Sequence, residues 1–221
     1  MNKKRRGILL LVLGAVMILA GFGLYGIYER QDSMAGQNAE ILLRELDYEI
    51  RFNSSFAVPG ESPAESPPSS EDEVPADREK PEIPNRTPNE KEMPIRTLSG
   101  YDLIGVLRVP SVGIELPVLE TWSYPLLNVA PCRYSGSLED GDLILLGHDY
   151  KSHLQPLRKV AVGDEVQFTD VNGTVYNYFV ETVEQIHESE PELLASEHPL
   201  IIFTCTRDGE YRIVVRCREA E

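Results

Sequence analysis

The amino-acid sequence predicts a mostly β domain, either a closed barrel or a sandwich, that follows an N-terminal transmembrane helix and a linker. Seven short apolar runs between residues 98 and 221 are separated by turn signals, which is typical of these two β architectures. An uncharged run occupies residues 7–28, and a proline-rich segment occupies residues 57–97. Only the last segment has enough apolar residues to enclose a core, and its length of about 120 residues is near the commonest domain size.

The chain begins with a pattern typical of a membrane anchor. Four basic residues at positions 3–6 precede 22 uncharged residues, Gly7–Tyr28. At about 1.5 Å per residue, a helix of this length spans the roughly 30 Å hydrocarbon core. The basic cluster predicts a cytoplasmic N-terminus and an extracellular remainder. A cleaved signal peptide is the alternative, but the apolar run exceeds the usual length of about 7–15 residues and no small-x-small cleavage site follows it.

Two segments separate this anchor from the β domain. Residues 29–56 have an amphipathic pattern that predicts a juxtamembrane helix, packed on its own domain or on the bilayer surface. Residues 57–97 contain nine prolines among Glu, Ser and Asp, and they cannot bury enough apolar surface to offset the entropy of ordering. Because proline extends such a chain, we expect this linker to be a stalk that holds the domain away from the membrane.

The elements of the β domain are predicted from the apolar runs and from the turns between them. Tight hairpins are expected at Asn172-Gly173 and Asp208-Gly209. Short helical pieces are expected at residues 124–129 and 190–196. The predicted strands are residues 101–109, 113–119, 142–146, 165–169, 174–186, 200–204 and 211–216.

Charge and cysteine content argue against several classes of function. The formal net charge of −15 disfavours a nucleic-acid partner, because phosphate binding needs clustered Lys and Arg. Three cysteines, Cys132, Cys205 and Cys217, cannot form a disulfide framework, although one bridge between Cys132 and Cys217 is possible. A free thiol outside the cytosol is exposed to oxidation, so we expect it to be buried or used chemically.

Two apolar runs lead directly into reactive side chains. Residues 143–147 precede His148, and residues 200–204 precede Cys205. Both runs are continuously apolar, which predicts strands buried on both faces. If the two strands run parallel, His148 and Cys205 reach the same rim of the domain, and the hairpin after Cys205 returns Arg212 close to the thiol.

These three groups suit nucleophilic catalysis by a thiol. A nearby cation favours the reactive thiolate, and an imidazole can protonate a departing amine. A guanidinium offers fixed, charged donors to a tetrahedral oxyanion, where the loss of a comparable donor costs about 3–4 kcal/mol. The prediction is therefore Cys205 as nucleophile, His148 as proton-transfer partner and Arg212 as oxyanion donor, with Arg207 and Arg216 as rivals for the last role.

The residues around these groups resemble the sortase family over about residues 100–218. The family's nucleophile motif, Thr-Leu-x-Thr-Cys-Thr, is matched by residues 201–206, where Ile201 and Ile202 replace the first Thr and the Leu. The family's His is matched by His148 in the run Leu-Gly-His-Asp-Tyr, and its Arg before an apolar strand is matched by Arg212. Cys217 stands where many relatives have Gly. The pattern is similar to the class B and class D-like groups.

The resemblance implies an eight-stranded β-barrel with its active site at one rim and no required organic cofactor. Some sortases are activated by calcium, and no calcium or other metal site can be assigned in this sequence. The implied activity is cleavage of a Leu-Pro-x-Thr-Gly-like sorting motif near the C-terminus of a secreted protein. The thioacyl-enzyme on Cys205 would pass its acyl group to an amine of a peptidoglycan precursor or a pilin. The implied location is the cell membrane of a Gram-positive type of envelope, single-pass, with the catalytic domain outside.

The sequence also offers other candidate residues and alternative functions. Thr204, His153 and Trp122 are candidate substrate contacts, and His153 and Trp122 could instead be structural. Asp149 is a candidate for orienting the His148 imidazole. An L,D-transpeptidase is disfavoured because its Ser-His-Gly-Cys motif is absent, and a papain-like protease because its Cys precedes its His. The alternative function is a membrane-tethered scaffold or binding domain whose active site is degenerate.

Overall fold

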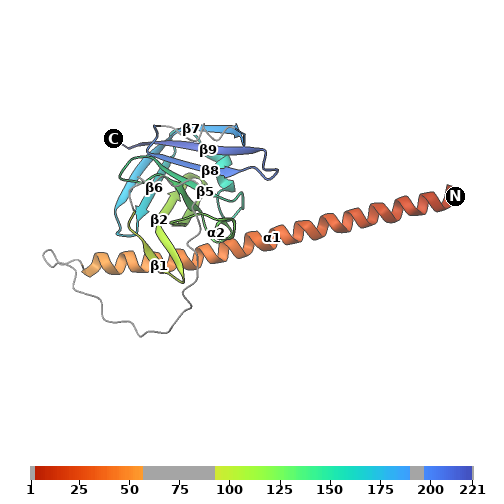
Figure 1. Cartoon of the computed structure of the whole chain (residues 1–221), viewed down its shortest axis with the longest axis horizontal. Coiled ribbons are helices and arrows are strands. Elements are labelled where there is room, and N and C mark those ends of the chain that lie inside the picture. The colour runs from red at the N-terminus through yellow and green to blue at the C-terminus, as the bar shows by residue number, and fades with distance from the viewer. Residues whose placement is uncertain (1–2, 57–92, 190–196, 221) are drawn as a thin grey trace.

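The computed structural model describes residues 3–56, 93–189 and 197–220, and it shows a β-barrel packed against one end of a long helix (Figure 1). The elements in chain order are α1 Lys3–Phe56, β1 Arg96–Leu98, β2 Tyr101–Val109, the 3-10 helix η1 Pro110–Val112, β3 Ile114–Leu119, α2 Tyr124–Leu127, β4 Cys132–Ser135, β5 Leu143–Gly147, the 3-10 helix η2 Gln155–Lys159, β6 Glu165–Asp170, β7 Val175–His187, β8 Leu200–Cys205 and β9 Tyr211–Glu219.

Eight of the strands form a closed barrel. The sheet order is β2-β3-β4-β5-β8-β9-β7-β6, and the pairing of β6 with β2 closes it, while β1 pairs along β2 as an additional strand. Gly105 allows this closure, because a Cβ there would lie 2.2 Å from the carbonyl oxygen of Thr169 on β6. The predicted mostly β fold is confirmed, and the closed sheet decides for a barrel over a sandwich.

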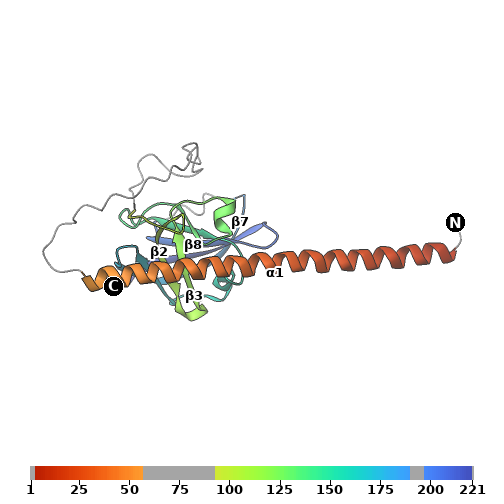
Figure 2. The ribbon, with the colours of Figure 1, turned by 90° about the horizontal axis from the view of Figure 1, so that it is seen from below.

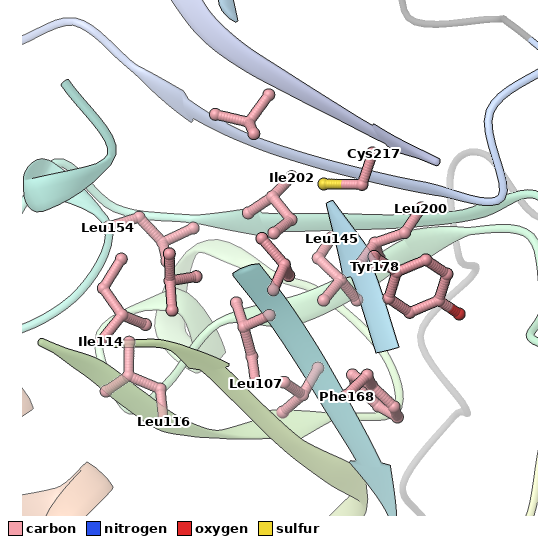
Figure 3. Packing of buried hydrophobic residues seen from close by; sticks show 14 of the residues in the cluster. Leu107, Ile114, Leu116, Leu145, Leu154, Phe168, Tyr178, Leu200, Ile202 and Cys217 are labelled. Carbon is pink, nitrogen blue, oxygen red and sulfur yellow. The ribbon is translucent and has the colours of Figure 1, made fainter. Parts of the chain in front are cut away.

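The barrel wall lies between two layers of apolar side chains. The inner layer fills the barrel and includes Leu145 of β5 with Leu200 and Ile202 of β8 (Figure 3). The outer layer covers one face of the wall and includes Ile201 and Phe203 of the same strand. Since successive residues of a strand point to opposite faces, β8 is apolar at every position from Leu200 to Phe203. This arrangement confirms the predicted burial of both faces.

Helix α1 combines the predicted anchor and the predicted juxtamembrane helix in one continuous element. Its first part, residues 11–27, is exposed and strongly apolar, and α1 is the one helix in the described part of the chain that is long and apolar enough to cross a membrane. Its second part carries a buried stripe with alternating spacings of three and four residues, made of Asp32, Ala35, Ala39, Leu42 and Leu46. This stripe packs on the barrel, where Figure 2 shows α1 passing β2 and β3.

Helix α1 packs on the barrel, which is one of the two placements expected for residues 29–56. The helix that carries the predicted anchor contacts the barrel directly, so the predicted linker is not the only connection between anchor and barrel. Residues 57–92 of that linker lie outside the described residues, as does the predicted short helix at 190–196. The end of the predicted linker belongs to the barrel, since β1 begins at Arg96.

Two short strands were not predicted. β1 has three residues and β4 has four, too few to show an alternation of apolar and polar positions. β4 closes the gap between β3 and β5 through a parallel pair at Leu119 and Cys132 and an antiparallel ladder to β5. The seven predicted strands all form, with boundaries shifted by up to three residues.

Candidate active site

His148 and Cys205 emerge from neighbouring parallel strands. β5 and β8 pair in parallel, with Gly147 opposite Thr204. His148 follows Gly147, and Cys205 follows Thr204. Parallel strands end at the same edge of a sheet, so both side chains reach the same rim of the barrel. A Cβ at Gly147 would lie 2.7 Å from Leu154 Cδ1, so the missing side chain lets the segment after His148 fold closely over the end of β5.

Arg212 faces Cys205 across the β8–β9 hairpin. The antiparallel register places Cys205 directly opposite Arg212. The connecting turn is held by the Thr206 amide, which donates to the Tyr211 carbonyl at 2.7 Å, and by Gly209, whose φ of 79° lies in the left-handed region that glycine adopts without strain. The Asp208-Gly209 turn predicted from the sequence therefore sets the position of the guanidinium.

The two rival arginines lie elsewhere. Arg216 is opposite Ile201 and forms an ion pair with Glu184, about 13 Å along the strand from Arg212 at roughly 3.3 Å per residue. Arg207 lies in the turn after Cys205, and its guanidinium stacks 4.3 Å from the centre of the Tyr28 ring. Arg207 is thus the nearer rival, because it lines the same cavity as Cys205.

A cavity of about 260 Å³ joins the imidazole and the thiol. Its lining consists of Tyr28, Gln31, His148, Asp149, Tyr150, Cys205, Thr206 and Arg207. Arg212 approaches the thiol from β9, outside this lining, and its Nη1 donates to the Glu188 carbonyl at 2.8 Å. That bond leaves the other guanidinium nitrogens as donors for a group bound beside Cys205.

In the absence of substrate, the surroundings of Cys205 and His148 disfavour the thiolate and the imidazolium. Partial burial raises the pKa of the Cys205 thiol, although the Arg212 guanidinium acts in the opposite direction. Burial also lowers the pKa of His148, whose ring packs against Tyr150 at 5.0 Å between centroids. Near neutral pH the prevailing pair is therefore a neutral thiol and a neutral imidazole. Arg212 is the group that favours the thiolate.

The three candidate substrate contacts are not placed at this cavity. Thr204 is 0% exposed because it alternates with Cys205 and points into the barrel, and His153, in the loop after β5, is 1% exposed. Trp122 is partly buried and stacks on Tyr134 at 5.8 Å between ring centroids. A substrate on the surface would not reach Thr204 or His153 in this structure, and Trp122 packs with the outer apolar layer.

Asp149 does not orient the imidazole through its carboxylate. Its two carboxylate oxygens accept bonds from Arg158, at 3.2 Å from Nε and 2.9 Å from Nη2. Its backbone carbonyl accepts a bond from the Tyr28 hydroxyl at 2.7 Å. Asp149 instead links the loop after His148 to η2 and to helix α1.

The other two cysteines are free, buried thiols on opposite faces of the barrel wall. Cys132 belongs to the outer apolar layer and Cys217 to the inner one, which explains why the possible bridge is not formed. Burial raises the pKa of both thiols, that of Cys217 to about 12, so neither is a reactive nucleophile. Within the described residues, no group of three or more His, Cys, Asp or Glu side chains could hold a metal ion.

Sequence reasoning missed the part of the cavity that comes from helix α1. In the sequence, Tyr28 is only the last residue of the predicted membrane span, and Gln31 follows it without any distinguishing pattern. The stripe with three- and four-residue spacings after Tyr28 was the available signal, because it indicates a helix with one packed face. It does not reveal which partner that face contacts.

The solved structures that this chain resembles are sortases. The solved structures similar to this chain include sortase C1 of Streptococcus agalactiae in complex with MTSET (20% identity, 53% of this chain and 69% of that chain, TM-score 0.48). They also include sortase C of Clostridium perfringens with the C-terminal cell wall sorting motif (18% identity, 54% and 71%, TM-score 0.49) and sortase A of Listeria monocytogenes (23% identity, 54% and 88%, TM-score 0.49). A comparison with the curated proteins found no match. The family model of the sortase domain matches residues 107–220, more than half of the chain and nearly all of the barrel, and the chain therefore belongs to the sortase family.

Proposed function

We propose that this chain is a membrane-anchored cysteine transpeptidase in which Cys205 is the nucleophile, His148 transfers protons and Arg212 stabilises the oxyanion. The observation that carries the proposal is the position of Cys205, which lies opposite Arg212 in one ladder and directly follows Thr204, the partner of the residue before His148, in the other. Family membership supports the reaction class, since sortases are cysteine transpeptidases. The class within the family, B or D-like, remains a prediction.

The reaction forms and breaks one bond in each half. His148 takes the thiol proton as Cys205 attacks the Thr carbonyl of a Leu-Pro-x-Thr-Gly-like sorting motif, and the carbonyl oxygen, on which negative charge develops, accepts bonds from Arg212. The peptide C–N bond breaks, and the His148 imidazolium gives its proton to the departing amine. An amine of a peptidoglycan precursor or of a pilin then attacks the thioester, His148 takes its proton, and the thiolate leaves.

The proposed location is the cell membrane, with the N-terminus in the cytoplasm and the barrel outside. The exposed apolar part of α1 supports a bilayer anchor, because residues 11–27 bury nothing against the barrel. The proposed partners are secreted proteins that carry the sorting motif and the amine acceptor. A cleaved leader is the alternative, and the molecular mass of the chain recovered from membranes distinguishes the two.

The direct test uses the full chain in detergent micelles, because Leu42 and Leu46 of α1 belong to the outer apolar layer and truncation would expose it. The protein is incubated with a panel of sorting-motif peptides and an amine acceptor, and intact mass spectrometry follows the acyl-enzyme. We expect a hydroxylamine-sensitive adduct in the parent and in Cys132→Ala but not in Cys205→Ala. No adduct and no peptide cleavage across the panel would favour the degenerate scaffold domain.

A further inference from the structure

Helix α1 changes its surroundings abruptly at Tyr28. All residues from 11 to 27 are exposed, and most of them are large and apolar. Tyr28 is the first partly buried residue, and it is also the last residue of the uncharged run. A span that begins at Gly7 and covers the roughly 30 Å hydrocarbon core at about 1.5 Å per residue ends close to Tyr28. The bilayer surface and the first contact with the barrel therefore coincide.

The contacts that follow Tyr28 fix the helix to the loop after His148. The Asp32 carboxylate accepts bonds from the backbone amides of Lys151 at 3.3 Å and Ser152 at 3.0 Å, and from the Ser152 hydroxyl at 2.5 Å. Glu29 pairs with Lys151 at 2.5 Å. Gly36 permits the close approach, since a Cβ there would lie 2.9 Å from the Ser152 Cβ.

Apolar packing extends the attachment along the helix. Ala35, Ala39, Leu42 and Leu46 are at most 2% exposed against the barrel. Burial of a leucine side chain contributes about 1.5–3 kcal/mol, so two leucines and the Asp32 bonds are enough to hold the helix in one position. A continuous helix from the bilayer to this interface transmits that position to the barrel as a rigid arm.

The catalytic cavity lies at the membrane end of this arm. Tyr28 and Gln31 line it together with His148 and Cys205. In Figures 1 and 2 the end of the barrel where β8 and β9 are joined points toward the N-terminal half of α1. The cavity is therefore within about two helical turns, or roughly 11 Å, of the end of the apolar run.

The charge of this rim fits a position next to lipid headgroups. Lys151, Arg158, Lys159 and Arg207 line a second, open cavity that shares Asp149 and Arg207 with the catalytic one. Two of the cations are paired, Lys151 with Glu29 and Arg158 with Asp149, which leaves an excess of positive charge in a chain of net charge −15. Basic groups at a bilayer surface are attracted to anionic lipids.

We propose that α1 holds the catalytic cavity at the bilayer surface, so that the chain selects a scissile bond lying a short distance from its substrate's own membrane anchor. This selection rests on the proposed transpeptidase function. The acceptor amine must also reach the bilayer surface. Substrate choice is then set partly by distance from the membrane, in addition to the peptide motif.

The position of the barrel is tested without any catalysis. Glu210 is exposed in the turn between β8 and β9, and it is replaced by Cys in a Cys205→Ala background and labelled with a dye. Energy transfer from this dye to a lipid dye is then measured in vesicles that contain the full chain. Ala39→Glu places a charge in the buried stripe, and Asn38→Glu places the same charge on the exposed face of the same turn. We expect strong transfer in the parent and in Asn38→Glu and weak transfer in Ala39→Glu. Equal transfer in all three would overturn the proposal.

Substrate selection is tested with motif peptides joined to a transmembrane helix by a short or a long rigid helical spacer. The short-to-long ratio of acyl-enzyme formation should be about tenfold or more in the parent and in Asn38→Glu, because the arm confines the cavity to one height, and near one in Ala39→Glu. If Ala39→Glu does not give a cooperative thermal transition, Asp32→Ala replaces it. A ratio near one in the parent would overturn the proposed selection by distance. The absence of an acyl-enzyme adduct with any peptide would instead refute the transpeptidase function, and the energy-transfer measurement would still decide the position of the barrel.

Discussion

Replacement of Arg212 by alanine separates the proposed oxyanion donor from its rivals. Arg212 is the cross-strand partner of Cys205, a geometry in which the Cβ atoms lie about 4.5–5.5 Å apart. At a separation of about 5 Å, a positive charge stabilises a thiolate by roughly 3 kcal/mol near a protein surface and by less than 1 kcal/mol in bulk water, and the partly buried thiol lies between these limits. Loss of an oxyanion donor alone lowers kcat by about 10²–10³-fold.

We therefore expect Arg212→Ala to lower kcat by at least about 10²-fold and to raise the pKa of the Cys205 thiol, because the Arg212 charge acts to lower it. The rate of peptide cleavage measures the first effect, and the pH dependence of iodoacetamide alkylation measures the second. The fold should be retained, because the Arg212 side chain is partly exposed and its hydrogen bond to the Glu188 carbonyl lies at the surface.

Two matched variants complete this experiment. Arg218→Ala removes an exposed arginine from the same strand and should leave both measurements unchanged. Arg207→Ala removes the arginine that lines the cavity and should affect kcat less than Arg212→Ala does. If Arg212→Ala kept kcat within a few-fold of the parent while Arg207→Ala lost most of it, the oxyanion donor would be Arg207 and the reasoning from strand register would be refuted.

Three further predictions concern pH and packing. The pH profile of kcat/KM should be a broad bell, because the acid limb follows a His148 pKa lowered from 6.5 and the alkaline limb a Cys205 pKa raised from 9.0; a limb between these two ordinary values would contradict the assignment. Burial lowers the pKa of His153 to about 4, so the unfolded chain takes up the proton first and stability should fall by about 3 kcal/mol as pH decreases from about 6.5 to about 4. Thermal melts between pH 7 and 4.5 should show a smaller loss for His153→Gln than for the parent, and an equal loss would assign it to other groups. Gly105→Ala should lower the free energy of unfolding by about 1–3 kcal/mol or more, because the new methyl group meets the Thr169 carbonyl; an unchanged urea midpoint would show that β2 and β6 can separate at no cost.

Most strands of the barrel could be predicted from the sequence, because each has a local pattern of apolar residues between turn residues. Segments of five or more residues that are rich in apolar side chains predicted seven strands, with the Asn172-Gly173 and Asp208-Gly209 turns as boundaries. The continuous apolar character of β5 and β8 predicted their burial on both faces. β1 and β4 were not predicted, because strands of three and four residues are too short to show a two-residue period of apolar and polar positions. The pairing of β6 with β2 joins residues 59 to 65 positions apart, and no local pattern encodes it.

The candidate site was predictable where it depends on strand ends and not where it depends on distant packing. The position of Arg212 follows from a short hairpin, so the spacing from Cys205 was enough to infer it. Thr204 was misplaced because a motif shows which residues are neighbours, whereas the inside or outside of a barrel depends on the whole sheet. Tyr28 enters the cavity only because α1 docks on the barrel more than 100 residues away, which required the three-dimensional structure.

Because β8 is buried on both faces, the accessibility of the Cys205 sulfur depends on which face of the strand its position occupies. Thr204 occupies an interior position and Cys205 an exterior one, so a shift of one residue in the pairing of β8 would exchange them. Substitutions that preserve the length of the strand alter packing and leave the sulfur accessible. Deletion of a single residue before Cys205 would turn the proposed nucleophile into an interior, unreactive thiol like Cys217.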